Sequence, residues 1–243
     1  INGLSKKGFG VLATVATGYG AKLLEAYPDV EVRDGRLDAG GMLDMIKSSG
    51  AGLLIDASHP YAEAVSINAR AASRRAEIPY IRFERKKTAL DADNIVEAAS
   101  FEAAAEVLNN IKGNIFLAVG SKNIKSFTRR IPDFGERLVA RVLPMSEALK
   151  VCEEAGLNAG NIIAAKGPFS VEMNTAMLKY CNACIMVTKD SGDAGGMAEK
   201  MEACRKAGIP LMVVKRPDNG SEKGLNSIDE VLKQTCFYLR GES

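Results

Sequence analysis

The sequence has no tryptophan, a single histidine and no apolar run long enough to cross a membrane. A membrane helix needs about 18 consecutive apolar residues, whereas the longest apolar runs of this chain have the length of strands. The charges nearly cancel, with 32 Lys and Arg residues against 30 Asp and Glu residues. A general nucleic-acid binder carries a basic excess or a basic stripe. We therefore expect neither a membrane nor a nucleic acid as partner.

The chain also lacks a pattern of histidine and cysteine residues that would make a metal site. Cys181 and Cys184 form one CxxC pair, with no second pair and no nearby histidine to complete a zinc site. The five cysteines are odd in number and lie in apolar segments, which is typical of a reduced cytoplasmic chain. The first residues lack the apolar core of a signal peptide. We expect buried thiols, no resident metal and a cytoplasmic location, with metal or redox use of the CxxC as the alternative.

Short apolar runs alternate along the chain with longer segments of helical period, and this alternation predicts parallel βα units. The expected strands are 9–17, 30–33, 52–57, 78–83, 115–119, 137–143, 162–165, 184–188 and 210–214. The expected helices are 18–26, 39–48, 60–76, 122–130, 146–155, 170–180, 197–207 and 228–239. Gly156, Gly208 and Gly241 are well placed to end three of these helices.

Residues 85–99 interrupt this rhythm, since they carry mixed charge without a clear period. We interpret them as a linker between two doubly wound, Rossmann-like α/β domains with parallel sheets, at 1–94 and 95–243. One large open sheet is the alternative. Ligands of such sheets bind beyond the carboxyl ends of the strands. The loops that follow strands are therefore the candidate sites, and we expect the active site in the cleft between the domains.

Two such loops stand out in the first half. In residues 16–20, the glycines at 18 and 20 permit close approach of a phosphate to a helix start, although an ordinary tight turn is the alternative. In residues 56–61, the only histidine of the chain, His59, lies between Ser58 and Pro60. His59 can hydrogen-bond a ligand or relay a proton, or simply cap the helix. Asp56 and Ser58 are too close in sequence to form a catalytic triad with it.

Lysine and glycine residues follow several strands in the second half. The loops are 120–123, 166–170 and 189–196, and they bring Lys122, Lys166 and Lys189, with Lys200 one turn into the following helix. Free backbone N–H groups and lysine charges together predict a pocket for carboxylates or phosphates. The alternatives are a solvated loop and, at Ser121, a helix cap.

Several stretches match a known family. They are DASHPYA at 56–62, IPYIRFER at 78–85, GSK at 120–122, KGPFS at 166–170, TKDSG at 188–192, GG at 195–196, EK at 199–200 and VKRP at 214–217, together with 32–37. In this order they resemble the precorrin-6A reductases of cobalamin (vitamin B12) biosynthesis, including the enzymes that act on cobalt-precorrin-6A. The first two stretches are the most specific, and the resemblance spans almost the whole chain.

The resemblance implies an oxidoreductase that uses NADPH or NADH to reduce a carbon–carbon double bond of the precorrin-6A or cobalt-precorrin-6A ring. Direct hydride transfer would be followed or accompanied by protonation. The implied catalytic residues are His59, Lys189 and Asp190. The implied cofactor-binding residues are Thr17, Gly18, Tyr19, Arg36, Ser58, His59 and Pro60. The implied residues for the carboxylate-rich substrate are Arg82, Ser121, Lys122, Lys166, Gly167, Ser191, Gly192, Gly195, Gly196 and Lys200, with Arg85 as a further basic candidate.

The family's first strand and its Gly-Gly-Thr loop have no counterpart in this sequence. Residues 1–8 resemble the end of the helix that follows that loop, so we expect the strand and loop to precede Ile1, with loss of this strand as the alternative. The choice between NADPH and NADH, the presence of cobalt in the ring, the proton donor and the oligomeric state stay open. The alternative functions are a methyltransferase of the same pathway and a non-catalytic two-domain protein that binds a tetrapyrrole or another anion.

Overall fold

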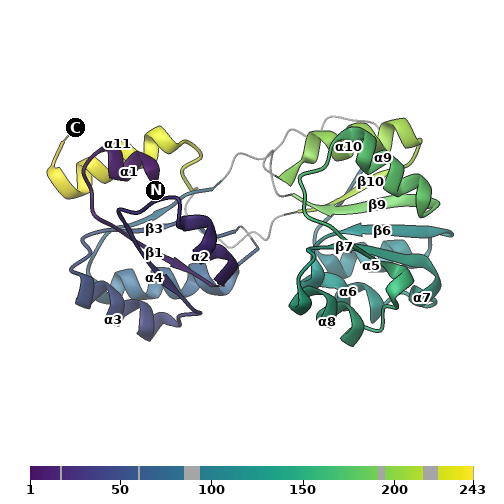
Figure 1. Ribbon diagram of the computed structural model, residues 1–243, viewed down its shortest axis with the longest axis horizontal. Coiled ribbons are helices and arrows are strands. Elements are labelled where there is room, and N and C mark those ends of the chain that lie inside the picture. The colour runs from purple at the N-terminus through teal and green to yellow at the C-terminus, as the bar shows by residue number, and fades with distance from the viewer. Residues whose placement is uncertain (17, 60, 85–93, 191–194, 216–223, 243) are drawn as a thin grey trace. The chain divides into compact units, whose positions relative to one another are not determined.

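The computed structural model describes residues 1–243 except 17, 60, 85–93, 191–194, 216–223 and 243. The chain divides into two compact units (Figure 1). Unit 1 comprises Ile1–Arg85 and Asp218–Ser243, and unit 2 comprises Lys86–Pro217. Within the described residues, no helix combines the length and apolar character needed to span a membrane.

Unit 1 contains two pairs of parallel strands. Its elements are α1 (Asn2–Lys6), β1 (Val11–Val15), α2 (Gly18–Leu24), β2 (Val30–Asp34), α3 (Ala39–Ser49), β3 (Leu54–Asp56), α4 (Glu63–Ala76), β4 (Tyr80–Arg82) and α11 (Ile228–Arg240). Strand β1 pairs with β2, and β3 pairs with β4, as two separate sheets in the described part of the chain. Leu43 and Ile46 of α3 pack with Ala72 of α4 in a small apolar cluster.

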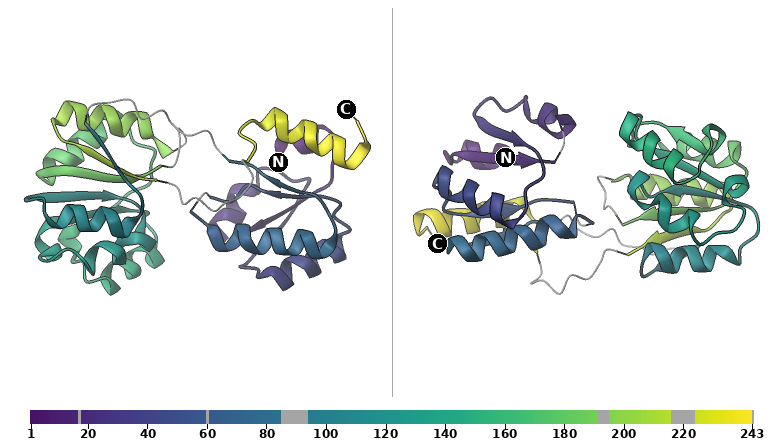
Figure 2. Two further views of the ribbon diagram at one scale, coloured as in Figure 1. Left: turned by 180° about the vertical axis from the view of Figure 1, so that it is seen from behind. Right: turned by 90° about the horizontal axis from the view of Figure 1, so that it is seen from below.

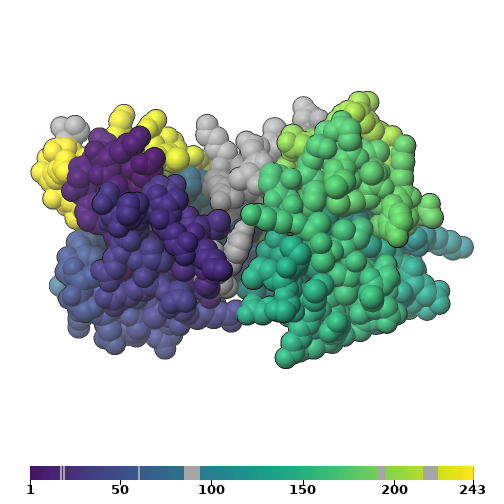
Figure 3. All heavy atoms as spheres, viewed as in Figure 1, coloured from purple at the N-terminus to yellow at the C-terminus, as the bar shows by residue number. Residues whose placement is uncertain are grey.

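The last helix, α11, belongs to unit 1, although we expected residues 95–243 to form the second domain. It packs beside α1, as the neighbouring yellow and purple atoms of Figure 3 show. Arg240 stacks its guanidinium 4.4 Å from the centre of the Phe9 ring. Next to the helix, the backbone of Leu225 bonds to both Arg82 and Glu84. The expected boundary is therefore wrong for this helix, because its apolar face is buried on unit 1.

Unit 2 is built on a single parallel sheet with the strand order β5-β10-β9-β6-β7-β8. Its strands are β5 (Ile95–Ala98), β6 (Asn114–Ala118), β7 (Leu138–Val142), β8 (Ile162–Ala164), β9 (Ala183–Lys189) and β10 (Leu211–Val214). Its helices are α5 (Phe101–Asn109), η1 (Ser121–Asn123), α6 (Ile124–Thr128), α7 (Phe134–Arg137), α8 (Ser146–Glu154), η2 (Ala159–Asn161), α9 (Val171–Tyr180) and α10 (Met197–Ala207).

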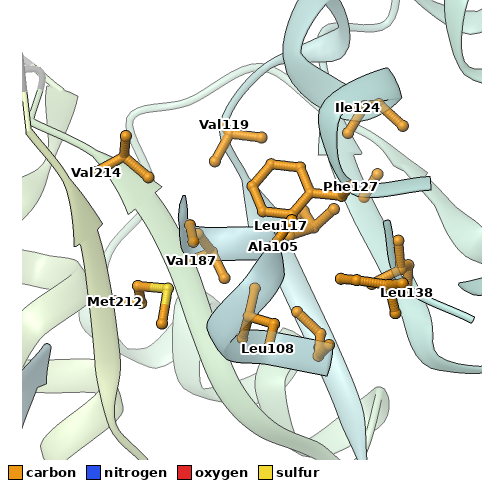
Figure 4. Close-up of a cluster of buried hydrophobic side chains, with 14 of the residues drawn as sticks. Ala105, Leu108, Leu117, Val119, Ile124, Phe127, Leu138, Val187, Met212 and Val214 are labelled. Atoms are coloured by element: carbon orange, nitrogen blue, oxygen red, sulfur yellow. The ribbon is translucent and has the colours of Figure 1, made fainter. Parts of the chain in front are cut away.

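Helices cover both faces of this sheet (Figures 1 and 2). Residues of α5, α6 and α8 pack on one face, and residues of α9 and α10 pack on the other. Figure 4 shows the first of these layers, in which Phe127 and Leu138 lie among fully buried aliphatic side chains. Each such side chain contributes about 1.5–3 kcal/mol by leaving water. The expected α/β class with doubly wound parallel strands is confirmed.

Helix α5 was not among the expected helices. Two further differences from the expected elements lie where local signals compete. Strand β5 occupies part of the stretch 85–99 that we interpreted as a linker, because its pairing with β10 overrides its mixed charge. Helix α4 begins at Glu63 rather than at residue 60, since the N–H of Ala62 closes a turn onto the carbonyl of His59. Gly208 and Gly241 end their helices with positive φ, as predicted.

Candidate functional site

A buried ion pair lies at the carboxyl ends of β3 and β4. The parallel register makes Asp56 and Arg82 partners, and Arg82 Nη1 lies 2.7 Å from Asp56 Oδ1. The side chains of Arg82 and Asp56 are only 8% and 2% exposed. The hydroxyl of Tyr80 donates to Asp56 Oδ2 at 2.8 Å. Both oxygens of the buried carboxylate are therefore bonded, which stabilises its charged form.

The hydrogen bonds around Asp56 set its pKa. Burial alone would raise it, but hydrogen bonds from the Ser58 and Ser66 side chains, the Ser58 N–H and Tyr80 outweigh burial, so the pKa of Asp56 is lowered. Burial and the bond to Asp56 raise the pKa of Tyr80 well above its usual value. At neutral pH, Asp56 is therefore a charged acceptor and Tyr80 a neutral donor.

This network fixes the turn that carries His59. The N–H of Ser58 donates to Asp56 Oδ1 at 2.9 Å, and Arg82 Nη1 donates to Ser58 Oγ at 3.0 Å. His59 follows as an exposed side chain, whose Nδ1 accepts a hydrogen bond from the N–H of Tyr61 at 3.3 Å. A neutral imidazole with this bond carries its proton on Nε2. In this form Nε2 is a hydrogen-bond donor.

The second cluster of polar groups lies in unit 2, at the ends of the neighbouring strands β6 and β9. From β6 the chain continues to β7 on one side of this pair, and from β9 it continues to β10 on the other side. Such a switch point is where doubly wound sheets bind ligands. Lys122 follows β6, and Lys189 is the last residue of β9. Burial lowers the pKa of Lys189, and the charge of Lys122 adds to this effect. The two lysines therefore lie close enough to repel one another.

A cavity of about 240 Å³ opens beside these strand ends. It is lined by Arg141, Gly167, Pro168, Phe169, Asn174, Gly195, Gly196 and Lys200. Arg141 comes from β7, and Lys200 comes from the second turn of α10. Both side chains are buried, with 8% of each residue exposed.

Aromatic rings and an amide hold the guanidinium of Arg141. Its carbon lies 4.3 Å from the centre of the Phe169 ring and 5.4 Å from that of Phe116. Nη1 donates to Asn174 Oδ1 at 2.8 Å and lies 3.4 Å from Met177 Sδ. Burial lowers the pKa of Arg141 to about 10. Arg141 therefore keeps its charge at neutral pH in a fixed orientation.

Lys200 is the second buried cation of the cavity. Its Nζ donates to the carbonyl of Gly195 at 2.6 Å. Burial, together with the charges of Arg141 and Lys189 and against a smaller opposite effect of Glu199, lowers its pKa to about 8. Among the described residues, the ion pairs include neither Lys200 nor Arg141.

The chain as a whole was compared with known proteins. A family model described as "Precorrin-6x reductase CbiJ/CobK" matches residues 1–235. The chain belongs to the precorrin-6x reductase family. This result confirms the resemblance inferred from the motifs and makes the protein an oxidoreductase.

Individual members of the reductase family agree with this assignment. The cobalt-precorrin-6A reductase of Priestia megaterium is 40% identical over 215 residues, which cover 88% of this chain and 84% of that protein. The enzyme of the same name from Methanothermobacter thermautotrophicus is 35% identical over 235 residues, covering 95% and 76%. A solved structure of CobK precorrin-6A reductase matches with a TM-score of 0.75 at 22% identity, covering 94% of this chain and 97% of that one. The structural match supports the fold.

Four residues that we expected to bind substrate in this reductase line the unit 2 cavity. They are Gly167, Gly195, Gly196 and Lys200. Ser121 and Lys122 follow β6, and Lys166 is exposed after β8. Of the expected catalytic residues, Lys189 ends β9, and Asp190 is buried with its N–H bonded to Val214 O. Ser191 and Gly192 lie outside the described residues, as does the basic candidate Arg85.

The expected cofactor residues of unit 1 are spread over three segments. Gly18 is the exposed first residue of α2, Arg36 is exposed between β2 and α3, and Ser58 and His59 follow β3. Thr17, Pro60 and the side chain of Tyr19 lie outside the described residues. Arg82, expected to bind substrate, bonds to Asp56, Ser58 and Glu84 within unit 1.

Four lining residues of the cavity were not among the expected site residues, namely Arg141, Pro168, Phe169 and Asn174. A signal for Arg141 was available, because it is the only charged residue in the apolar strand Leu138–Val142. A cation inside a buried strand requires a partner, and this requirement marks a site.

All five cysteines are free thiols, and Cys184 alone among them is half-buried rather than buried. Burial raises the pKa of Cys204 to about 12. The buried thiol expected at Cys181 is confirmed. In the part of the chain that the structure describes, no group of three or more His, Cys, Asp and Glu side chains is arranged to hold a metal ion.

Proposed function

We propose that this protein reduces a carbon–carbon double bond of precorrin-6A or cobalt-precorrin-6A with NADPH or NADH, as a step of cobalamin biosynthesis. The family match over residues 1–235 carries the proposal. The names of the two relatives above favour the cobalt-containing ring as substrate. The cations at the strand ends of unit 2 suit a macrocycle that carries acetate and propionate side chains.

The reaction balances as a hydride addition. A reduced nicotinamide, when bound, supplies the hydride. One ring carbon accepts the hydride, the adjacent carbon accepts a proton, and the double bond between them becomes a single bond. The protein orients the reactants, and such positioning accounts for a large part of the rate enhancement in reactions of this kind.

The residues at the strand ends of unit 1 fit a dinucleotide. A side chain added at Gly18 would meet no atom within 4 Å, so this position leaves room for a ligand next to the backbone. The Ser58 hydroxyl and the exposed His59 lie on a turn held by Asp56. We assign cofactor contacts to Thr17, Gly18, Tyr19, Arg36 and the turn at 58–60.

For the proton, we assign His59 as the first candidate, because its exposed imidazole can take up a proton from solvent and pass it on as an imidazolium. Lys189 and Asp190 are the other candidates, and water is the remaining one. The lysine and glycine residues after β6, β8 and β9 are assigned to the substrate.

An anaerobic assay with both ring forms and both nicotinamides tests the proposal. We expect the absorbance band of the reduced nicotinamide to disappear in step with formation of the dihydro ring. Consumption of a methyl donor without nicotinamide oxidation would instead identify a methyltransferase. Ring binding with no consumption of either compound would identify a non-catalytic binding protein.

A further inference from the structure

The unit 2 cavity holds two buried cations, and neither forms an ion pair with an acidic side chain of the described residues. Arg141 and Lys200 each expose 8% of their surface. Burying a charge without a partner is costly. Two like charges in one small cavity increase this cost, so the cavity calls for an anion.

The unused hydrogen-bond donors of both cations point to the same conclusion. Arg141 uses Nη1 for Asn174 and Met177, while its Nε and Nη2 have no partner among the described residues. Neither atom is one of the fully enclosed polar atoms that lack a hydrogen-bond partner, so both remain accessible to a ligand. Lys200 Nζ uses one of its three protons for Gly195 O. The free donors lie in the side chains that line the cavity.

Hydrogen bonds and ring contacts hold the Arg141 guanidinium in one orientation, which suits an anionic group of fixed geometry. Asn174 Nδ2 donates to the carbonyls of Phe169 and Ser170, at 3.1 and 2.9 Å, and this fixes its Oδ1 toward Arg141. The Phe169 and Phe116 rings restrict the guanidinium plane. A planar fork held in this way matches the two oxygens of a carboxylate.

We propose that Arg141 and Lys200 jointly bind one carboxylate group in this cavity, with Asn174 and Phe169 as positioning residues for Arg141. The inference rests on the proposed function only in identifying that carboxylate as an acetate or propionate side chain of the macrocycle. A cavity of about 240 Å³ accommodates one such side chain and excludes the ring itself.

The primary test is an absorbance titration of the protein with cobalt-precorrin-6A in the absence of nicotinamide. We expect Arg141→Met and Lys200→Met each to weaken binding roughly tenfold to hundredfold, which is the range for a lost hydrogen bond to a charged group. Arg141→Lys keeps the charge but loses the fork, so it should also weaken binding. Lys206→Met on the same helix, where the side chain is 48% exposed, should leave binding unchanged.

A stability measurement distinguishes a variant that has lost only the binding site from one that has lost its fold. Lys200→Met removes a buried charge, so we expect this variant to resist urea at least as well as the wild type while it binds the ring more weakly. Unchanged ring binding in both Arg141→Met and Lys200→Met would overturn the inference and leave the proposed function intact. Weaker binding of NADPH with unchanged ring binding would assign the anion to the cofactor and would also overturn the inference.

A small probe covers the case in which the wild type does not bind the ring, which would contradict the proposed function. Sodium propionate, compared with sodium chloride at equal ionic strength, should raise the unfolding midpoint of the wild type and of Lys206→Met but not of Lys200→Met. Equal shifts in all three proteins would then overturn the inference. Binding should also take up protons near pH 8, because a bound anion raises the pKa of Lys200. The charge of Glu199 acts in the same direction, and the charges of Arg141 and Lys189 act in the opposite one.

Discussion

Arg82 and Asp56 form a buried ion pair, 2.7 Å between nitrogen and oxygen, at partner positions of two parallel strands. The same guanidinium nitrogen holds Ser58, the residue before His59. Arg82 therefore links the paired strands β3 and β4 to the turn at Ser58.

Loss of this contact should destabilise unit 1. We expect Arg82→Met to lower the free energy of unfolding by about 3 kcal/mol, because Asp56 would remain buried without its partner. Arg33→Met is the matched control, since Arg33 and Glu31 form an exposed pair of the same unit and such pairs contribute about 0–1 kcal/mol. Urea unfolding measures both. Similar losses in the two variants would contradict the assigned importance of the buried pair.

The lowered pKa of Asp56 predicts how this stabilisation depends on pH. The unfolded state titrates at the ordinary value of 3.8 and the folded state below it, so the contribution is complete above that value and is lost as pH falls through the folded pKa. The difference in unfolding free energy between wild type and Asp56→Asn should therefore be constant near neutrality and shrink in acid. A difference that grew in acid would show that the pKa is raised instead.

The charge of Lys200 should destabilise the folded protein, whereas the charge of Asp56 stabilises it. Its pKa is about 8 when folded and 10.5 when unfolded, so the unfolded state binds more protons between these values and stability rises with pH there. Lys200→Met should therefore be more stable than the wild type at pH 7, by at most roughly 3 kcal/mol. The gain should disappear toward pH 10.5. Urea unfolding over this range measures it, with Lys206→Met as the exposed control.

The assigned proton donor makes a kinetic prediction. His59→Ala should lower kcat roughly a hundredfold, the lower range for general acid catalysis, and should alter the pH profile of kcat. Tyr61→Phe keeps the backbone N–H that bonds His59 Nδ1 and should leave the profile unchanged. If His59→Ala turns over like the wild type at every pH, the acid is another group or water.

Helix α11 should protect unit 1 and not unit 2. Leu232 lies against Gly3, so that a Cβ at Gly3 would be 3.0 Å from it. Leu232→Ala should therefore increase hydrogen exchange in α1 and leave β6 of unit 2 protected. Phe237→Ala, at a side chain that is 58% exposed, is the control. Increased exchange in β6 with the Leu232 variant would contradict the assignment of α11 to unit 1.

Most elements of unit 2 could be predicted, because their signals are local. The apolar run of β10 and the glycine after α10 each identify a boundary without knowledge of the rest of the fold. The place of α11 could not be predicted, since an amphipathic period shows that one face is buried but not against which unit. Strand β5 was missed for a related reason, because only its pairing with β10 makes it a strand.

The residues of the candidate site likewise include some that could be predicted from the sequence and some that could not. The glycines and lysines after strands were found because strand ends are identifiable from sequence, and four of them line one cavity. Arg141 was not found, because its role depends on Phe116 from β6 and Phe169 from the loop after β8, which only the folded sheet brings together.

Unit 1 is assembled from both ends of the chain, with all of unit 2 encoded between them. A ribosome therefore makes every described strand of unit 2 before it makes α11. The surface of α1 that contacts α11 stays uncovered until α11 has been made. The interval in which α1 lacks this partner therefore lasts for the synthesis of all of unit 2.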